Sequence, residues 1–227
     1  MTIPARLNHL DVSAKAVTPV RLPDGSLYAA RLKRPFDILF VIAIAPILVP
    51  LVLVLALAVL LTTRSNPFYT QERIGRNGRL YRMWKLRSMV PDADAALARL
   101  LAADPALAAE WESKQKLEND PRITGIGRLL RKTSLDELPQ FLNVLTGDMS
   151  LIGPRPMLPE QRSLYPGTDY YRLRPGISGP WQVSERNATT FADRARFDRA
   201  YLANLTFGRD VSLLVATVRA VLRGTGC

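Results

Sequence analysis

Two adjacent carboxylates, Asp136 and Glu137, stand near the middle of a chain of 227 residues. They follow Ser134 in a Ser-Leu-Asp-Glu sequence, which matches a capping box at the start of a helix. In that interpretation Ser134 is the N-cap, Glu137 is its partner at the third helical position, and both acids complement the helix dipole. In a basic setting the same carboxylates could instead attack phosphorus as a nucleophile or bind Mg²⁺.

Cationic side chains crowd around these acids in the sequence. Arg131 lies just upstream, with Arg122, Arg128 and Lys132, and Arg155 lies downstream in a Gly-Pro-Arg-Pro sequence. A helix N-terminus beside several guanidinium groups is a typical phosphate site. A rigid turn with a surface arginine explains the Gly-Pro-Arg-Pro sequence equally well. Two further arginines that could contact an anion, or lie on plain surface, are Arg174 and Arg186.

The composition narrows the chemistry that these groups can perform. Lys and Arg number 31 against 20 Asp and Glu, which gives a net charge of +11, and only six of the 31 cations are lysines. This excess of arginine favours bidentate binding of phosphate or carboxylate. The single cysteine, Cys227, excludes an intrachain disulfide and a cysteine-based zinc site, and the single histidine, His9, argues against a His-dependent triad.

The part of the chain that must position these groups, residues 65–227, has the pattern of a small α+β domain. Residues 68–74 and 80–86 are predicted as the strands of a β-hairpin, with turn residues at 75–78. Residues 92–117 are rich in Ala and Leu and predict two helices broken at Pro105. The remaining expectations are a helix after Ser134, loops at 147–159 and 174–181, and helices at 191–205 and 211–222.

A long apolar run precedes this domain. Residues 38–61 contain no charged side chain, and as a helix they would extend about 36 Å, enough to cross a bilayer core of roughly 30 Å. A buried core helix is disfavoured because a domain of this size seldom encloses a helix that is apolar all round. We therefore predict a membrane helix at residues 31–64, preceded by a tail at residues 1–30 without a signal peptide.

Because the helix contains two prolines, the sequence does not determine its path through the membrane. Pro46 and Pro50 lie four residues apart, so both fall on one face of the helix and can bend it sharply. Basic residues flank the run on both sides, so the distribution of positive charge does not fix an orientation. A helix that enters and leaves by one leaflet and a helix that spans the bilayer both fit these observations.

Seven short motifs that occur in a fixed order carry a resemblance to a known family. They are Lys33-Arg-Pro-Phe-Asp37, Gln71-Glu-Arg-Ile-Gly75, Trp84-Lys-Leu-Arg-Ser-Met89, Asp120-Pro-Arg-Ile-Thr124, Ser134-Leu-Asp-Glu-Leu-Pro-Gln140, Gly147-Asp-Met-Ser-Leu-Ile-Gly-Pro-Arg-Pro156 and Arg174-Pro-Gly-Ile-Ser-Gly179. In this order they resemble the bacterial sugar transferases, the monotopic phosphoglycosyl transferases. Among these, the chain is most similar to the compact galactosyl-phosphate and glucosyl-phosphate transferases that start exopolysaccharide repeat units. The resemblance covers roughly residues 31–224.

The resemblance implies a reaction and a location. The family transfers a sugar phosphate, here expected to be a hexose phosphate, from a UDP-sugar to undecaprenyl phosphate and releases UMP, with Mg²⁺ as cofactor. It implies a mainly helical fold with a small β-hairpin, a re-entrant membrane helix broken at Pro50 with help from Pro46, and contact with membrane lipid. The implied location is the bacterial inner membrane with the catalytic domain on the cytoplasmic face, and a homodimer is a further expectation.

The resemblance also implies roles for single residues. Asp136 would be the nucleophile that carries the phosphosugar, and Glu137 would help to place the metal or the acceptor, so both acids are expected metal ligands. The expected phosphate-binding residues are Arg155, Arg131, Lys85, Arg174 and Arg186.

The chain departs from the family pattern at two positions. Val49 stands where many members have a serine before the proline of the helix break, so the kink lacks a hydroxyl that could bond a freed carbonyl. Glu185 replaces a glycine before Arg186 and Asn187, which adds bulk and negative charge near a predicted anion site.

Two other functions compete with the transferase interpretation. The net charge of +11 and the many arginines would suit a membrane-anchored nucleic-acid-binding protein, but the cations are dispersed, aromatics make up only 7% of the chain and no recognition module is present, so we expect no nucleic acid. A non-catalytic membrane scaffold is the other alternative. Retention of Asp136, Glu137 and Arg155 argues against it.

Overall fold

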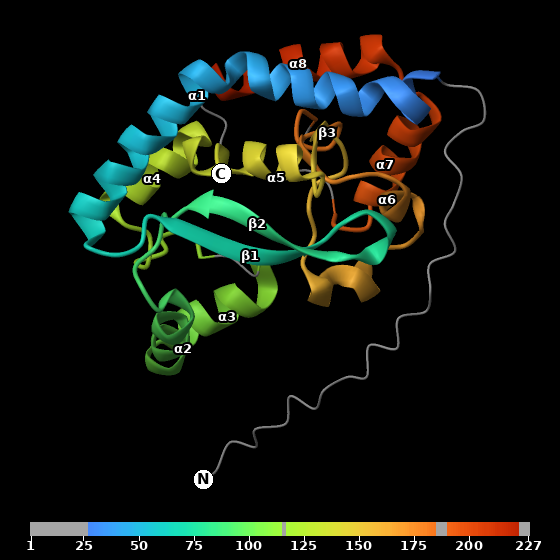
Figure 1. Ribbon diagram of the computed structural model, residues 1–227. Helices are drawn as coiled ribbons and strands as arrows, with labels where there is room; N and C mark the ends of the chain where they lie inside the picture. The colour runs from blue at the N-terminus through green and yellow to red at the C-terminus, as the bar shows by residue number, and fades with distance from the viewer. Residues whose placement is uncertain (1–26, 115–116, 185–189, 223–227) are drawn as a thin grey trace.

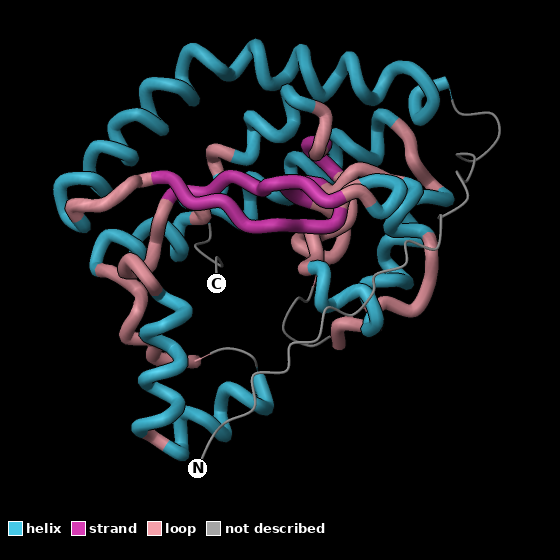
Figure 2. The backbone as a smooth tube through the Cα atoms, turned by 60° about the horizontal axis from the view of Figure 1, so that its bottom comes forward, coloured by secondary structure: helices cyan, strands magenta, loops and turns pink. Residues whose placement is uncertain are grey.

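The structure, a computed structural model, describes residues 27–114, 117–184 and 190–222. It is mainly helical and contains two small sheets. The long helix α1 runs along one side of the molecule, α4 and α5 lie directly beneath it, and the β1–β2 hairpin lies beneath α5 (Figure 1). The hairpin of helices α2 and α3 projects from the opposite side (Figures 1 and 2).

The apolar run forms a single helix. A π-helical turn at Tyr28–Leu32 leads directly into α1 (Lys33–Thr63), so residues 28–30, predicted as tail, are helical. The helix continues through Pro46 and Pro50 and bends along its length (Figures 1 and 2). The combined helix Tyr28–Thr63 is long and apolar enough to cross a membrane, which makes it a candidate membrane segment.

The predicted hairpin is confirmed at both strand boundaries. Strand β1 (Phe68–Ile74) pairs antiparallel with β2 (Leu80–Leu86), and Phe68 lies opposite Leu86. The chain reverses in a short 3₁₀ turn at Arg76–Gly78, where Asn77 and Gly78 both take positive φ angles. Asn and Gly are the residues that tolerate this left-handed conformation best, which explains why the turn could be predicted.

The helices that follow the hairpin agree in part with the prediction. Helix α2 (Ala93–Ala103) ends before Pro105, and Pro105 begins α3 (Pro105–Lys114), so the predicted break is confirmed. Proline suits this position because the first residue of a helix needs no N–H donor. Helix α4 (Gly125–Thr133) adds a short element that the sequence pattern does not predict.

The two predicted loops prove to contain a second sheet. Strand β3 (Ser150–Ile152) pairs in parallel with β4 (Gly176–Ser178), so the prediction of plain loops at 147–159 and 174–181 was wrong there. The two backbones approach so closely that a Cβ atom on Gly176 would lie 2.1 Å from the Gly153 nitrogen. Only glycine, which has no Cβ atom, fits where two backbones lie this close together. The glycines therefore determine where the two chain segments meet, beside the cavity described below.

The remaining elements complete the domain. Helix α5 (Gln140–Thr146) lies between α1 and the hairpin, and Asn143 fastens it to β2: its side-chain carbonyl accepts from the Trp84 N–H at 2.9 Å and its amide donates to the Arg82 carbonyl at 2.8 Å. The elements after β3 are a 3₁₀ turn at Pro159–Leu164, α6 (Asp169–Arg172), β4, α7 (Arg194–Ala203) and α8 (Phe207–Leu222), so the predicted helices at 191–205 and 211–222 are confirmed with slightly different ends.

Both halves of α1 pack against the domain. In the N-terminal half, Tyr28 and Val41 join a core cluster with buried residues of β3 and α8, such as Ile152 and Leu213. In the C-terminal half, Ala56 and Val59 pack in another cluster with Leu86 and Leu130 of β2 and α4. A third cluster joins the end of β1 to α6 and the Tyr165 region and contains none of the described residues of α1.

Buried carboxylates tie the start of α1 to the domain. Asp37 accepts hydrogen bonds from the Ser150 hydroxyl at 2.7 Å and from the Leu151 N–H at 3.2 Å. Asp210 of α8 accepts from the Lys33 ammonium group at 2.6 Å and also from the hydroxyls of Tyr28 and Tyr201. Buried carboxylates that are fully hydrogen-bonded in this way hold two elements in one relative position.

Candidate active site

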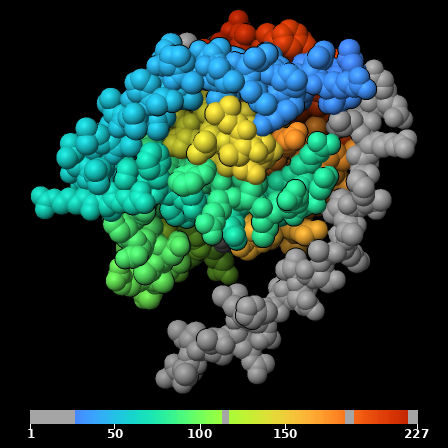
Figure 3. All heavy atoms as spheres, viewed as in Figure 1, coloured from blue at the N-terminus to red at the C-terminus, as the bar shows by residue number. Residues whose placement is uncertain are grey.

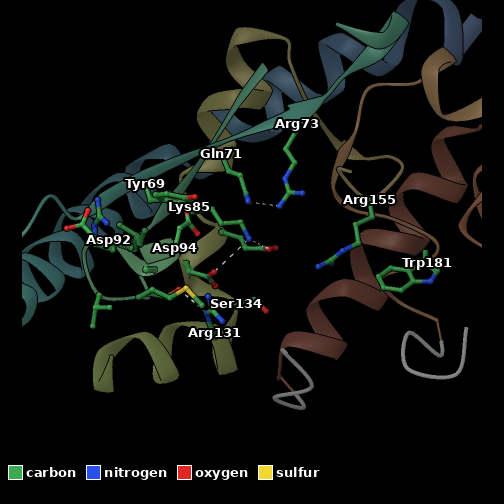
Figure 4. A pocket seen from close by; sticks show the side chains of 18 residues that line it. Tyr69, Gln71, Arg73, Lys85, Asp92, Asp94, Arg131, Ser134, Arg155 and Trp181 are labelled. Atoms are coloured by element: carbon green, nitrogen blue, oxygen red, sulfur yellow. Dashed lines mark hydrogen bonds and ion pairs between the residues drawn. The ribbon is translucent and has the colours of Figure 1, made fainter. Parts of the chain in front are cut away.

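A cavity of about 640 Å³ lies beside the hairpin, and side chains from several distant segments line it (Figure 4). Strands β1 and β2, the end of α4 and the loop after β3 all contribute. The charged lining residues that matter for the chemistry are Arg73, Lys85, Arg131, Asp136, Glu137 and Arg155. The structure therefore gathers both predicted acids and three of the five predicted phosphate-binding residues around one cavity.

The backbone at the acids differs from the predicted capping box. Ser134 takes a left-handed conformation with φ 56° and ends α4, and its N–H bonds to the carbonyls of Leu130 and Arg131. Its side chain caps no helix, and the acids lie on a single 3₁₀ turn, Leu135–Glu137. The capping box was wrong because an N-cap needs extended backbone, whereas α4 runs right up to Ser134. The predicted helix after Ser134 begins only at Gln140.

This turn places Asp136 in a buried position at the cavity wall. The residue is 7% exposed, and the only described ion-pair partner within 4 Å is Lys85, whose Nζ lies 3.9 Å from Asp136 Oδ2. The same ammonium group lies 2.8 Å from Glu137 Oε1. Burial raises the pKa of Asp136, while the charge of Lys85 opposes this shift. Lys85 thus bridges the two carboxylates from the neighbouring strand.

Two arginines face the same cavity from opposite parts of the chain. Arg131 lies in the last turn of α4, where its Nε donates to the Ser88 hydroxyl at 2.9 Å. Arg155 lies in the Gly-Pro-Arg-Pro loop, and its guanidinium is 5.3 Å from the centre of the Trp181 ring. The loop is held against the hairpin because the Ile74 N–H donates to the Met157 carbonyl at 3.1 Å. Both arginines can therefore reach an anion bound beside Asp136.

The other two predicted phosphate-binding residues are not brought into this group. Arg174 is among the lining residues of neither described cavity, and its Nε donates to the Gly147 carbonyl at the end of α5, at 2.8 Å. Gly147 has a φ of 95°, so Arg174 holds a carbonyl at a left-handed helix end. Arg186 lies outside the described residues, together with Glu185 and Asn187.

Three cavity residues were missed in the sequence. Arg73, Arg194 and Trp181 adjoin Arg155, and a smaller cavity of about 200 Å³ has both Arg73 and Arg194 in its lining. Arg73 belongs to the Gln71-Glu-Arg-Ile-Gly75 motif, which could have marked it as a candidate. Nothing in the sequence pattern points to Arg194, because only the fold brings α7 next to the Gly-Pro-Arg-Pro loop.

The described residues contain no group of three or more His, Cys, Asp or Glu side chains that could hold a metal ion. Two adjacent carboxylates, Asp136 and Glu137, nevertheless line the cavity. Mg²⁺ commonly takes one or two protein carboxylates and completes its coordination with water and substrate phosphates. The donor set therefore fits Mg²⁺ that arrives with a phosphorylated substrate, and it does not fit a metal held by protein ligands alone.

Taken together, the site combines a buried carboxylate with several cations in one cavity. Such a site can bind a phosphorylated ligand through the cations and present a carboxylate oxygen to phosphorus. Residues 28–224 match the bacterial sugar transferase family, and the chain belongs to this family.

Individual relatives support the same assignment. The chain is 48% identical over 198 residues to an undecaprenyl-phosphate galactose phosphotransferase of Salmonella typhimurium and 43% identical over 199 residues to a UDP-galactose-lipid carrier transferase of Erwinia amylovora. Each match covers 86% of this chain but 41% of the relative, so the chain spans about two fifths of the length of these proteins. It is also 39% identical over 196 residues to the exopolysaccharide production protein ExoY of Sinorhizobium fredii, with 86% of this chain and 87% of that protein covered.

Proposed function

We propose that the chain transfers a hexose 1-phosphate from a UDP-sugar to undecaprenyl phosphate and releases UMP. The observation that carries this proposal is the buried Asp136 beside Glu137, in a cavity that also presents Lys85, Arg131 and Arg155. The relatives named for galactose phosphotransfer and for a lipid carrier support the choice of donor and acceptor. They also make galactose the first sugar to test.

The proposed mechanism has two displacements at the same phosphorus. A carboxylate oxygen of Asp136 attacks the phosphorus that bears the sugar, and the bond from this phosphorus to the bridging oxygen breaks, so UMP leaves with the electron pair. A phosphate oxygen of the lipid then attacks the phosphosugar on Asp136. The bond to the Asp136 oxygen breaks, which restores the carboxylate and leaves a diphosphate between lipid and sugar. Neither step requires a general base, because both attacking groups are anions.

The cations supply the stabilisation that phosphoryl transfer needs most. During phosphoryl transfer, negative charge is spread over the oxygens of the transferred group. Positioned cations therefore stabilise the transition state more than acid–base groups do. Lys85 already offsets part of the charge of the two carboxylates, and Arg131 and Arg155 face the same cavity. Asp136 and Glu137 would hold Mg²⁺ together with the substrate phosphates, and the bound ion would neutralise phosphate charge.

We propose further that α1 is re-entrant. Its two halves pack against one body, with Tyr28 and Val41 in one cluster and Ala56 and Val59 in another. Its outer face is apolar and exposed, including Ile47 at 77% exposure, and α5 is exposed directly beneath it (Figure 3). A helix that inserts into one leaflet and returns would keep both ends on the domain, whereas a straight spanning helix would separate them. The domain would then lie on the cytoplasmic face of the inner membrane.

The experiment that tests this function measures UMP release by the full chain in nanodiscs with Mg²⁺. A panel of UDP-sugars is supplied with and without undecaprenyl phosphate. We expect sustained release that requires both the lipid and one UDP-hexose. Release that ignores the lipid, or no release from any donor, would contradict the proposal.

A further inference from the structure

Three arginines gather beside the two carboxylates, in the smaller cavity whose lining also includes Lys85 and Glu137. Arg73 extends from β1, Arg155 from the loop after β3 and Arg194 from the start of α7. The guanidinium groups of Arg155 and Arg194 lie 5.3 and 4.4 Å from the centre of the Trp181 ring. In Figure 4 Arg73 and Arg155 extend into the cavity from different segments, with Trp181 beside Arg155.

No acidic side chain in the described parts of the chain forms an ion pair with these three arginines. Arg73 donates only to a neutral acceptor, Gln71 Oε1, at 2.6 Å. The Nε atoms of Arg73 and Arg194 are buried and have no hydrogen-bond partner among the described residues. Buried donors of this kind carry a free-energy cost, which a ligand with several acceptor oxygens would remove.

The three cations also repel one another. Burial and the charges of Arg155 and Arg73 together lower the pKa of Arg194 to about 10, while the charge of Asp198 opposes the shift. Burial lowers the pKa of Arg73 as well, and Arg155 adds to that shift. Trp181 holds two of the guanidinium groups by cation–π contact. The fold thus keeps three like charges together, as an anion-binding site requires.

Elements packed against α1 border both parts of the cavity. Leu135, next to Asp136, packs in the cluster that contains Ala56 and Val59 of α1. Met83 and Ile177, which line the smaller cavity, pack in the cluster that contains Val41 of α1. Because the proposed reaction places the sugar phosphate beside Asp136, the neighbouring arginines are positioned for the other phosphate of the donor.

From this arrangement we propose that Arg73, Arg155 and Arg194 form a separate subsite for the phosphate of the leaving nucleotide. The sugar phosphate of the donor would then lie beside Asp136, and the phosphate of the nucleoside monophosphate would lie among the three arginines. Trp181 acts as a positioning residue that orients two of the arginines. This inference rests on the proposed function for the identity of the nucleotide, and it assigns new roles to Arg73 and Arg194.

The test measures binding without any transfer. The full chain in nanodiscs is titrated with UMP, with inorganic phosphate and, separately, with undecaprenyl phosphate in the bilayer. We expect the Kd for UMP to rise at least about tenfold in Arg73→Gln and in Arg194→Gln, because each removes charged donors to phosphate. Arg196→Gln is the matched control, since Arg196 lies on the same helix with a side chain that is 75% exposed. Its Kd for UMP should stay within about twofold of the original value.

Folding is checked by the thermal unfolding midpoint of each variant. If a variant of a buried arginine unfolds, Arg155→Gln carries the test, because Arg155 lies in a loop and is less constrained. We expect inorganic phosphate to bind more weakly than UMP, with the same order of affinity among the variants.

Several outcomes would overturn the subsite. Folded variants that bind UMP as tightly as the original chain would remove it. If the variants bind UMP normally but no longer bind undecaprenyl phosphate, the arginines belong to the acceptor site instead. The result is separable from the proposed function: arginine-dependent UMP binding without transfer would contradict the function alone, and transfer with unchanged UMP affinity in the variants would contradict the subsite alone.

Discussion

Lys85 is the residue that most directly links the two carboxylates. It lies on β2, outside the turn that carries Asp136 and Glu137, so the hairpin supplies the cation closest to both acids. This arrangement explains how two acids can stand side by side at a partly buried cavity wall. Removal of the ammonium group would take away the cation closest to both carboxylates and leave the more distant Arg131 and Arg155 to offset their charge.

We expect Lys85→Gln to lower the rate of sugar-phosphate transfer by roughly 100-fold, the size of effect seen when one preorganised charge is removed from a reaction site. Lys132→Gln is the matched control, because Lys132 is an exposed lysine at the end of the neighbouring helix α4. Steady-state kinetics of UMP release measures both variants. Equal rates for the two would show that Lys85 has no special role.

The titration of Asp198 should make the free energy of unfolding depend on pH. It is buried, accepts a hydrogen bond from the Tyr165 hydroxyl at 2.8 Å, and burial raises its pKa to about 7. The folded state therefore binds more protons than the unfolded state between about pH 4 and pH 7. Stability is highest below this window and falls as the pH rises through it, by up to about 4 kcal/mol from this group.

Thermal unfolding of the chain and of Asp198→Asn between pH 5 and pH 8 measures this contribution. We expect the variant to lose less stability than the original chain over the range, since asparagine does not titrate. Parallel curves for the two proteins would contradict the assignment. Asp193→Asn, just before the start of the same helix, should leave the pH dependence unchanged, because the pKa of Asp193 is lowered and its carboxyl stays ionised over this range.

The carboxylates and their nearest cations could be predicted because they cluster in the sequence or belong to family motifs. Asp136, Glu137 and Arg131 lie within seven residues, and Arg155 stands in a distinctive Gly-Pro-Arg-Pro loop. Arg194 could not be predicted, because its place beside Arg155 depends on how α7 packs. Arg174 was predicted from its motif, but the structure uses its side chain to hold a helix end.

Among the elements, α1 is the candidate membrane segment, and its path would set how the chain lies in a bilayer. Pro46 and Pro50 lie within it, and its two halves contact the same domain. The re-entrant proposal predicts that both ends of α1 are accessible from the cytoplasm.

Single cysteines test this topology. Ala30→Cys and Asn66→Cys, each in a Cys227→Ser background, place a thiol at an exposed position before and after α1. In inside-out vesicles we expect an impermeant maleimide to label both positions at similar rates. Labelling of one position in inside-out vesicles and of the other only in intact spheroplasts would establish a spanning helix and contradict the proposal.

The elements themselves were predictable where the signal is local. The hairpin has turn residues at its tip, the break at Pro105 follows from proline chemistry, and α1 follows from an uninterrupted apolar run. Strands β3 and β4 were missed because each has three residues and pairs in parallel with a distant partner. The capping box was misassigned because a local sequence match competed with the end of α4, which only the fold defines.

At the scale of the whole molecule, buried polar contacts join α1, the candidate membrane segment, to the domain that contains the candidate active site. Asp37 of α1 accepts from the Ser150 hydroxyl and the Leu151 N–H at the start of β3, near the Gly-Pro-Arg-Pro loop. This connection holds the site at a fixed place relative to α1. It also means that the domain should lose stability when the contact is broken.

We expect Asp37→Ala to lower the free energy of unfolding by about 1–3 kcal/mol, because it leaves buried donors without an acceptor. Ser150→Ala should cost less, since the Leu151 N–H keeps its acceptor. In a double-mutant cycle the two changes should be non-additive, because they remove the same contact. Denaturant unfolding in detergent measures all four proteins, and additive losses would show that the residues act independently.

The central claim is that Asp136 carries the phosphosugar, and intact-protein mass spectrometry tests it most directly. The chain is mixed with Mg²⁺ and the UDP-hexose that supports transfer, without undecaprenyl phosphate, and quenched in acid. We predict a mass increase of one hexose phosphate on the original chain, its absence in Asp136→Asn, and its disappearance when the lipid is added. Transfer by the original chain with no such adduct, or an adduct that persists in Asp136→Asn, would contradict the account.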